Sequence, residues 1–262
     1  MTTMTGYGTP TGMTESTGRV AIDFWRVLRH PGAQYWITTI ATAERIVRSA
    51  GPLTFFVCFF NGTFTVITGA SILMDIGTDP GLVGLILANL GLREATLIVG
   101  TTAIAASMGA GYVTELGAMR VSEEIDAIEC IGLRSYPYLV STRVIGAFIA
   151  SWPIYCGAIL ATFAGGWFSA IFQAGALNPG NFGEWFNLGY APMDIIYTLF
   201  KGVIATVIVA IVCASFGYRA QGGPVGVGMA VGEAMNMSLV LVMIVNLFLS
   251  YAFWGIGSPT QL

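Results

Sequence analysis

Residues 53–74 read LTFFVCFFNGTFTVITGASILM, a stretch without a single charged side chain. A hydrocarbon core about 30 Å thick is crossed by about 20 residues of helix, so this stretch is long and apolar enough for one membrane span. Four further segments are similarly poor in charge, at about 95–113, 137–173, 194–218 and 234–257. The sequence therefore predicts an all-α membrane protein with about five transmembrane helices.

The composition of the whole chain agrees with this prediction and excludes several classes of function. Of its 262 residues, 55% are hydrophobic and only 10% are charged, whereas a soluble domain carries about 25% charged residues. The net charge of −3 provides no basic surface for nucleic acid. The four cysteines form no CxxC pair and there is one histidine, so no metal site and no catalytic residues are expected. No GxxxxGK[ST] motif occurs, so we expect no nucleotide to bind to this chain.

The N-terminal region differs from the rest of the chain. Residues 1–18 are polar and rich in Thr and Gly; they do not resemble a signal peptide, and a disordered cytoplasmic tail is expected. Residues 19–48 interleave five arginines with aromatic and aliphatic side chains. Such a segment is typical of an amphipathic helix that lies in the headgroup region. An ordinary surface helix is the alternative.

The positions of the basic residues predict which side of the membrane each loop faces. With the N-terminus inside, nine of the eleven Lys and Arg residues fall in cytoplasmic segments, as the positive-inside rule requires. The two exceptions are Arg93, which precedes Glu94, and Lys201, which lies within the fourth span. The predicted topology in the cytoplasmic membrane is N-terminus inside and C-terminus outside.

The segment between the second and third spans is the most highly charged part of the chain. Residues 115–132 read ELGAMRVSEEIDAIECIG, with five acidic residues and one arginine. Val121, Ile125 and Ile128 recur at helical spacing, which predicts an amphipathic helix over about 115–131 with an acidic face. Ser122 is the expected N-cap and Gly132 the expected stop signal. On this pattern alone, the helix is either a solvated loop or a docking surface for a cytoplasmic partner.

This segment closely resembles the signature of the MlaE/YrbE permease family. The family pattern runs E-L-G-x-M-R-V-x-E-x-I-D-A, followed by Y-L-V-x-x-R-V, which matches residues 138–144. A second pattern, R-x-x-G-G-x-x-G-[VL]-G, matches residues 219–228. The resemblance extends over about residues 20–257. One departure is Ser107, which stands where many bacterial members carry the arginine of A-G-R-x-G; this is more typical of the actinobacterial branch that is encoded with Mce proteins.

The resemblance implies that residues 49–262 form the permease domain of an ATP-driven lipid transporter. Such a permease would pair with a second, homologous permease in a heterodimer, with a dimer of ABC ATPases that bind ATP and Mg²⁺, and with MCE-domain proteins that form a tunnel outside the membrane. By resemblance, residues 115–131 are the helix that couples to the ATPase, through Glu115, Gly117, Arg120, Glu123, Glu124, Asp126 and Glu129. The second cytoplasmic loop, which carries the second family pattern, holds the separate site candidates Arg219, Gly222 and Gly223.

The lipid path is predicted from polar and polarisable side chains inside the spans. Polar groups at membrane depth are costly and mark functional sites, while aromatic and thioether side chains adapt to variable acyl chains. The candidates are Phe56, Phe60, Asn61, Phe64, Lys201 and Met237. For each, packing or lipid exposure is the alternative, and for Lys201 the alternatives are a salt bridge to Asp194 or Glu94, or snorkelling. An ATPase-independent secondary transporter, or a structural partner of another permease, is the alternative function. The identity of the lipid and the direction of transport stay open.

Overall fold

The computed structural model describes residues 33–132, 135–172 and 178–255, and the regular elements in these ranges are all helices. Five of them are long and apolar enough to cross a membrane, which confirms the predicted fold class. Four are single helices: α2 (Ala33–Asp75), α7 (Thr142–Phe172), α9 (Pro192–Tyr218) and α10 (Gly223–Trp254). The remaining span is built in sections, η1 (Pro80–Leu82), α3 (Val83–Ile86), η2 (Leu87–Ala95), α4 (Thr96–Met108), η3 (Gly109–Val113) and α5 (Thr114–Val121), of which η2 and η3 are π-helical. The shorter elements are α6 (Glu124–Cys130), η4 (Pro137–Ser141) and α8 (Pro179–Gly189).

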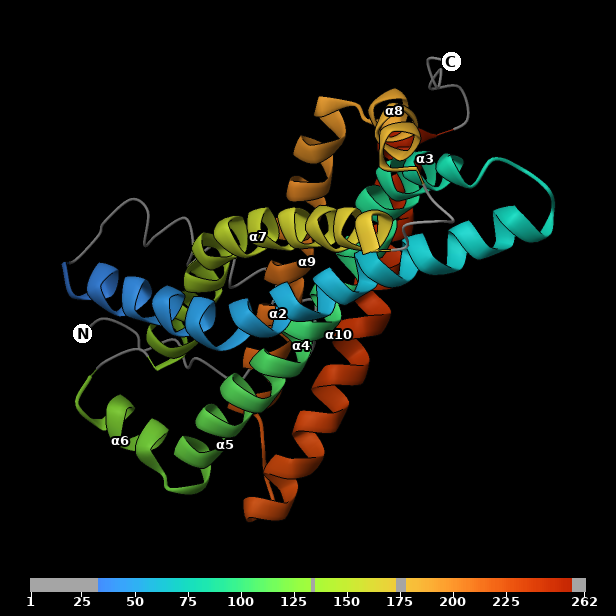
Figure 1. Cartoon of the computed structure of the whole chain (residues 1–262). Helices are drawn as coiled ribbons and strands as arrows, with labels where there is room; N and C mark the ends of the chain where they lie inside the picture. Colours follow the sequence, from blue (N-terminus) through green and yellow to red (C-terminus); the bar gives the residue numbers. More distant parts are fainter. Residues whose placement is uncertain (1–32, 133–134, 173–177, 256–262) are drawn as a thin grey trace.

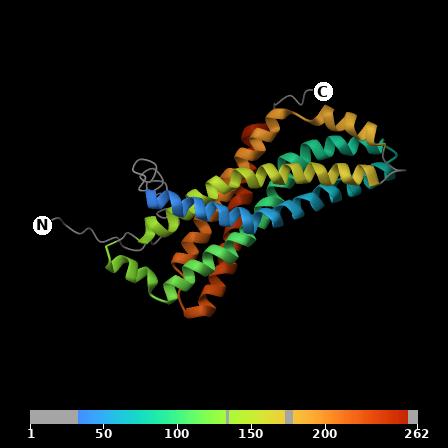
Figure 2. The ribbon, with the colours of Figure 1, turned by 60° about the vertical axis from the view of Figure 1, so that its left-hand side comes forward.

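The short helices mark two ends of the molecule. In Figure 1, α8 and α3 lie together at the top, and α5 and α6 lie at the bottom. We call these the α8 end and the α6 end. The loop between α9 and α10 also lies at the α6 end (Figure 1). Figure 2 shows α2 and α7 running side by side toward α8.

The backbones of α2 and α7 touch where glycines face each other. A Cβ atom on Gly165 would lie 2.0 Å from the carbonyl oxygen of Phe59, and one on Gly62 would lie 2.0 Å from that of Thr162. The hydroxyl of Thr63 donates a hydrogen bond of 3.1 Å to the Gly165 carbonyl. Inside a membrane, helices associate largely through such close packing of small residues. These glycines therefore set the distance between the two helices.

Besides a small cluster around Cys58, two buried clusters complete the interior of the described part of the chain. The larger of the two joins α2, α4, α5, α6, α7, α9 and α10, and its centre includes the fully buried Ile104, Leu116 and Tyr155. The smaller one lies at the α8 end, where Phe182 of α8 packs edge-on against Trp167 of α7, with ring centroids 5.1 Å apart. The α8 helix is thereby held against the membrane spans.

Several boundaries differ from those predicted. The second half of the expected interfacial segment is continuous with the first span in α2, which contains Pro52 and bends along its length (Figure 1). Residues 1–18 and 19–32 lie outside the described residues. The last span begins at Gly223 rather than near 234, because Glu233 lies inside α10. The second span begins at Pro80 rather than near 95, because Arg93 and Glu94 are accommodated within η2. Both helices are longer than the charge-free stretches from which they were predicted. Charged residues are tolerated inside them because these residues have partners or face a polar groove.

The contact between α2 and α7 provides a stability test on one helix. We expect Gly165→Ala to lower the free energy of unfolding by about 1–3 kcal/mol, the usual cost of overpacking, and so to lower the unfolding midpoint. The reason is that the new methyl group meets backbone atoms that cannot move aside. Gly157→Ala is the matched control, since a Cβ atom there meets nothing within 4 Å. Unfolding midpoints in one detergent compare the two variants. Equal midpoints would contradict the close contact.

Candidate functional site

A cluster of polar side chains joins three spans in the half of the molecule nearer the α8 end. We call it the intramembrane polar cluster, and it comprises Arg93 and Glu94 of η2, Asp194 and Lys201 of α9, and Asn246, Ser250 and Trp254 of α10. Its charges are two cations and two carboxylates, which sum to zero. Within the described part of the chain, no three His, Cys, Asp or Glu side chains gather where they could hold a metal ion.

One half of the cluster is the ion pair between Arg93 and Asp194. The Nη2 atom of Arg93 lies 2.7 Å from Oδ2 of Asp194, and the other carboxylate oxygen accepts a hydrogen bond of 2.8 Å from Nε1 of Trp254. The guanidinium also lies over the Trp254 ring, 5.2 Å from its centroid, a distance at which a cation is attracted to the aromatic face. This pair was not predicted, because Arg93 and Asp194 are 101 positions apart and no local pattern identifies partners so distant in sequence.

The other half surrounds Glu94. Its Oε1 atom lies 3.1 Å from Nζ of Lys201 and accepts a hydrogen bond of 2.6 Å from the Ser250 hydroxyl, while Oε2 accepts one of 2.8 Å from Asn246. Lys201 also donates to the Ser250 hydroxyl oxygen and to the Arg93 carbonyl, and its side chain is fully buried. Of the alternatives for Lys201, the salt bridge to Glu94 is therefore the one that the structure shows.

The predicted lipid-path residues lie in three separate places. Lys201 belongs to the polar cluster. Phe56, Phe60 and Phe64, spaced four residues apart, are exposed along one face of α2. Met237 lies on α10 beside a groove at the α6 end. The described residues offer no hydrogen-bond partner to the side-chain nitrogen of Asn61, on α2.

The acidic segment is two helices rather than the single helix predicted over 115–131. The chain turns between α5 and α6 at Glu123, which has a left-handed φ of 59°. Ser122 ends α5 and does not cap α6, because its hydroxyl bonds back to the Ala118 carbonyl at 3.0 Å. The turn brings Arg120 within 2.8 Å of Asp126, so the ion pair of Arg120 spans the break between the two helices. Gly132, with a φ of 82°, follows the end of α6 as predicted.

Some of the predicted coupling residues tie α5 and α6 to the membrane spans. Glu115 lies 3.1 Å from Arg45 of α2 and 3.3 Å from Arg143 of α7. Glu129 accepts hydrogen bonds from the hydroxyls of Ser135 and Tyr218, the latter on α9. Gly117 packs against α10, since a Cβ atom there would lie 2.8 Å from the Val227 side chain. The segment thus contacts four other elements.

The remaining acidic side chains face outward. Glu123 and Glu124 are both exposed on the turn between the two helices, and Glu124 accepts a hydrogen bond of 3.1 Å from the Ser122 hydroxyl. Arg120 and Asp126 form the ion pair just described. The turn therefore presents two adjacent carboxylates at the α6 end.

The second predicted loop is a tight turn before α10. Gly222 and Gly223 have φ values of 88° and 71°, a backbone conformation that favours glycine. A Cβ atom on Gly226 would lie 1.7 Å from the Gln221 carbonyl oxygen, so the first turn of α10 folds directly against the loop. Arg219 lies at the exposed end of α9.

At the α8 end, Asp79 fastens α8 to the start of the second span. Its carboxylate accepts hydrogen bonds from the Asn181 amide at 2.8 Å, the Trp185 indole at 3.1 Å and the Gly81 backbone N–H at 2.9 Å. Hydrogen bonding, chiefly from the Asn181 amide and then from Gly81 and Trp185, holds the pKa of Asp79 below its ordinary value because it stabilises the charged form.

Comparison with known proteins shows the family to which this chain belongs. A family model described as Permease MlaE matches residues 39–252, well over half of the chain. The chain belongs to the MlaE permease family. It is therefore a multi-pass membrane protein and a non-catalytic permease subunit of an ABC transporter, a class of subunit that implies an ATPase partner.

Individual relatives agree with the family assignment. The chloroplastic protein trigalactosyldiacylglycerol 1 of Arabidopsis thaliana is 29% identical over 247 residues, which are 90% of this permease and 67% of the relative. A probable ABC transporter permease of Synechocystis sp. is 32% identical over 166 residues, 63% of each chain. Another from Rickettsia bellii is 24% identical over 205 residues, 78% of each chain. The match thus spans less than two thirds of the Synechocystis relative.

In this permease, Ser107 stands where the family resemblance led us to expect an arginine. Its hydroxyl donates a hydrogen bond of 3.3 Å to the hydroxyl of Ser49, which joins α4 to α2. A neutral bridge between two spans stands where a cation was expected.

We expect Lys201→Met to lower the free energy of unfolding by about 3–5 kcal/mol, because removing one member of a buried ion pair leaves Glu94 without a cation. Combining it with Glu94→Gln should recover part of the loss, since no uncompensated charge then remains. Denaturant unfolding in detergent measures both variants. Arg48→Met, whose side chain is 80% exposed, is the control. Equal stabilities of Lys201→Met and the control would contradict a structural role for the pair.

A second pair of substitutions tests the ion pairs that Glu115 forms with Arg45 and Arg143. We expect Glu115→Gln to destabilise the permease by about 1–3 kcal/mol, because the charge-assisted bond to Arg143, 90% buried, is lost. Arg45→Gln removes only a partner that is 70% exposed, and should change the stability by less than about 1 kcal/mol. Thermal unfolding in detergent gives both values. An equal effect of the two substitutions would show that the Arg143 contact adds nothing.

Proposed function

We propose that this permease is the transmembrane subunit of an ATP-driven lipid transporter, with the α6 end in the cytoplasm. In this proposal it moves lipid between the cytoplasmic membrane and a tunnel of MCE-domain proteins at the α8 end. Membership of the MlaE family supports the transporter class. A lipid cargo is supported by the name of the Arabidopsis relative, which is that of a glycolipid, trigalactosyldiacylglycerol.

The observation that carries the proposal is the position of α5 and α6. The helix α5 continues the second span, and the segment contacts each of the other four spans: α2 and α7 through Glu115, α9 through Glu129, and α10 through Gly117. A displacement of the exposed turn would therefore be transmitted to all five spans. This is what a subunit requires when ATP is hydrolysed in another chain.

The partners follow from this assignment. An ABC ATPase dimer would bind at the α6 end and would hold ATP and Mg²⁺, and the carboxylates of Glu123 and Glu124 would meet basic side chains on it. Complementary charge of this kind sets partner choice and orientation more than affinity. A second, homologous permease would complete the membrane part as a heterodimer, as in the actinobacterial Mce systems that the serine at position 107 suggests.

The proposed lipid path includes an apolar surface for the acyl chains and a polar cluster for the headgroup. The exposed phenylalanines at 56, 60 and 64 provide an apolar face on α2, with Asn61 beside it. The polar cluster around Lys201 would lie on the outer side of the membrane, where its ion pairs could exchange partners with a passing headgroup.

The coupling is tested by reversing the charge of the turn. We expect Glu123→Lys combined with Glu124→Lys to reduce co-purification of the ATPase, and ATP-dependent lipid transport, by about tenfold or more, because like charges would then face each other. The matched control is Asp75→Lys combined with Glu184→Lys, which reverses two exposed carboxylates outside this segment, one at the end of α2 and one on α8. Mild-detergent purification followed by mass spectrometry measures the partners and the bound lipids.

Two outcomes would contradict the proposal. If both double variants retained the ATPase and transport, the turn would not be the docking site. If the unaltered permease purified alone and stable in several detergents, an ATPase-independent transporter would replace the ABC assignment.

A further inference from the structure

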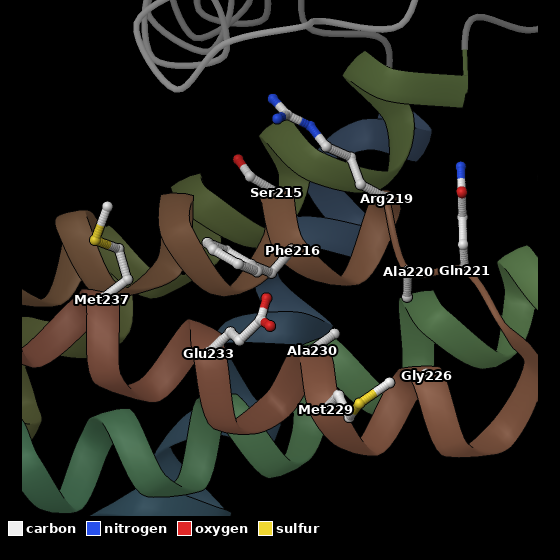
Figure 3. A pocket seen from close by; sticks show the side chains of 10 residues that line it. All are labelled: Ser215, Phe216, Arg219, Ala220, Gln221, Gly226, Met229, Ala230, Glu233 and Met237. Atoms are coloured by element: carbon white, nitrogen blue, oxygen red, sulfur yellow. The ribbon is translucent and has the colours of Figure 1, made fainter.

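A groove of about 510 Å³ lies at the α6 end between the last turns of α9 and the first half of α10. Figure 3 shows its two walls, one from each helix, with the connecting loop closing one end. The lining residues are Ser215, Phe216 and Arg219 of α9, Ala220 and Gln221 of the loop, and Gly226, Met229, Ala230, Glu233 and Met237 of α10. None of them belongs to the intramembrane polar cluster.

The groove contains a hydroxyl group that the protein does not satisfy. Ser215 is only 6% exposed, and its Oγ atom has no hydrogen-bond partner among the described residues. Ser238, on the facing helix, bonds to the carbonyl four residues earlier at 2.6 Å, as serines in helices commonly do. An unsatisfied buried polar group costs about 1–3 kcal/mol. A polar ligand in the groove would remove that cost.

The groove also carries both signs of charge. Arg219 lies on the α9 wall, and Glu233 extends from α10 toward α9 (Figure 3). Glu233 is about 15 Å along a membrane-crossing helix, at 1.5 Å per residue, and within the described part of the chain no cation pairs with it. A carboxylate at such a position is a functional candidate by default. The two charges together fit a ligand that is itself zwitterionic.

An apolar surface continues from the groove. Met229 and Met237 line it, and beyond Met237 the exposed apolar residues of α10 recur at helical spacing toward the α8 end: Val240, Ile244, Leu247, Phe248 and Tyr251. A pocket of this volume holds a headgroup and its glycerol backbone but not two acyl chains as well. The chains of a bound lipid would lie along this stripe.

We propose that the groove binds the headgroup of a glycerophospholipid that carries both a phosphate and a primary amine. Arg219 binds the phosphate, which its planar guanidinium suits; Glu233 accepts hydrogen bonds from the ammonium group; and Ser215 donates to a phosphate oxygen. This inference rests on the proposed function, since it names a cytoplasmic-leaflet entry site for the lipid. It adds a headgroup preference and a location separate from the polar cluster.

The test uses the permease with its co-purified partners in nanodiscs that contain a trace lipid with a diazirine in one acyl chain. Three probes differ only in the headgroup: phosphatidylethanolamine, the same lipid with its amine acetylated, and phosphatidylglycerol. After irradiation, mass spectrometry locates the labelled peptides. We expect phosphatidylethanolamine to label the α9 and α10 peptides of the groove about tenfold more than either other probe, the difference expected for one charge-assisted hydrogen bond.

Variants then assign the preference to single residues. Glu233→Gln should remove the preference for the amine, and Arg219→Gln should lower labelling by all three probes about tenfold. Glu184→Gln, an exposed carboxylate on α8, is the control and should leave the pattern unchanged. The comparison of the three probes on the unaltered permease needs no variant, so a folding defect in Glu233→Gln does not decide the result.

Equal labelling by the three probes, or labelling confined to other helices, would overturn the proposal. Labelling of a partner chain in place of the α9 and α10 peptides would also overturn it. The result is separable from the test of the proposed function. A complex that retains its ATPase and transports lipid without groove labelling refutes only the groove, whereas groove labelling without an ATPase refutes only the ABC assignment.

Discussion

The constraint on which this structure depends is that charge inside the hydrocarbon region must be paired. An uncompensated buried ion costs several kcal/mol, and the second and fourth spans each carry charged residues at membrane depth. Arg93 with Asp194, and Glu94 with Lys201, satisfy one another across η2 and α9. The last span adds Asn246, Ser250 and Trp254 to the same network. The second span, α9 and α10 are thereby fixed to one another by this network. The remaining two spans, α2 and α7, are fixed to each other by their glycine contacts.

At the α6 end, ion pairs and hydrogen bonds connect the α5 and α6 helices to the membrane spans. Glu115 joins α5 to α2 and α7, and Glu129 joins α6 to α9, at positions that water can reach. Ion pairs there are weaker and more easily exchanged than those at membrane depth. In the proposed function, buried ties near the α8 end and exposed ties at the α6 end suit a subunit that receives force at one end, and the two exposed carboxylates of the turn would meet the partner.

The last helix, α10, contributes both to the buried polar cluster near the α8 end and to the more exposed α6 end. Its final turns are bound into the polar cluster, while its first turns leave a groove with a carboxylate, an arginine and an unsatisfied hydroxyl. Between these regions it exposes an apolar stripe. The helix therefore carries polar groups toward both of its ends with an apolar surface between them, which is the pattern of polarity across a lipid bilayer.

The sequence by itself determined the all-α class, the five spans and their approximate centres, because the bilayer demands long apolar helices whatever their partners. Motif resemblance added the family. The cost of a charge inside a span, read from the sequence alone, also raised the salt bridge of Lys201 with Glu94 as one alternative. Only the tertiary structure decided that Arg93 pairs with Asp194, that Glu115 pairs with Arg45 and Arg143, and that the acidic segment breaks at Glu123. It also decided that Glu233 lies inside α10 beside a groove. These depend on which residues from distant parts of the chain meet, and local periodicity carries no information about partners about a hundred positions away.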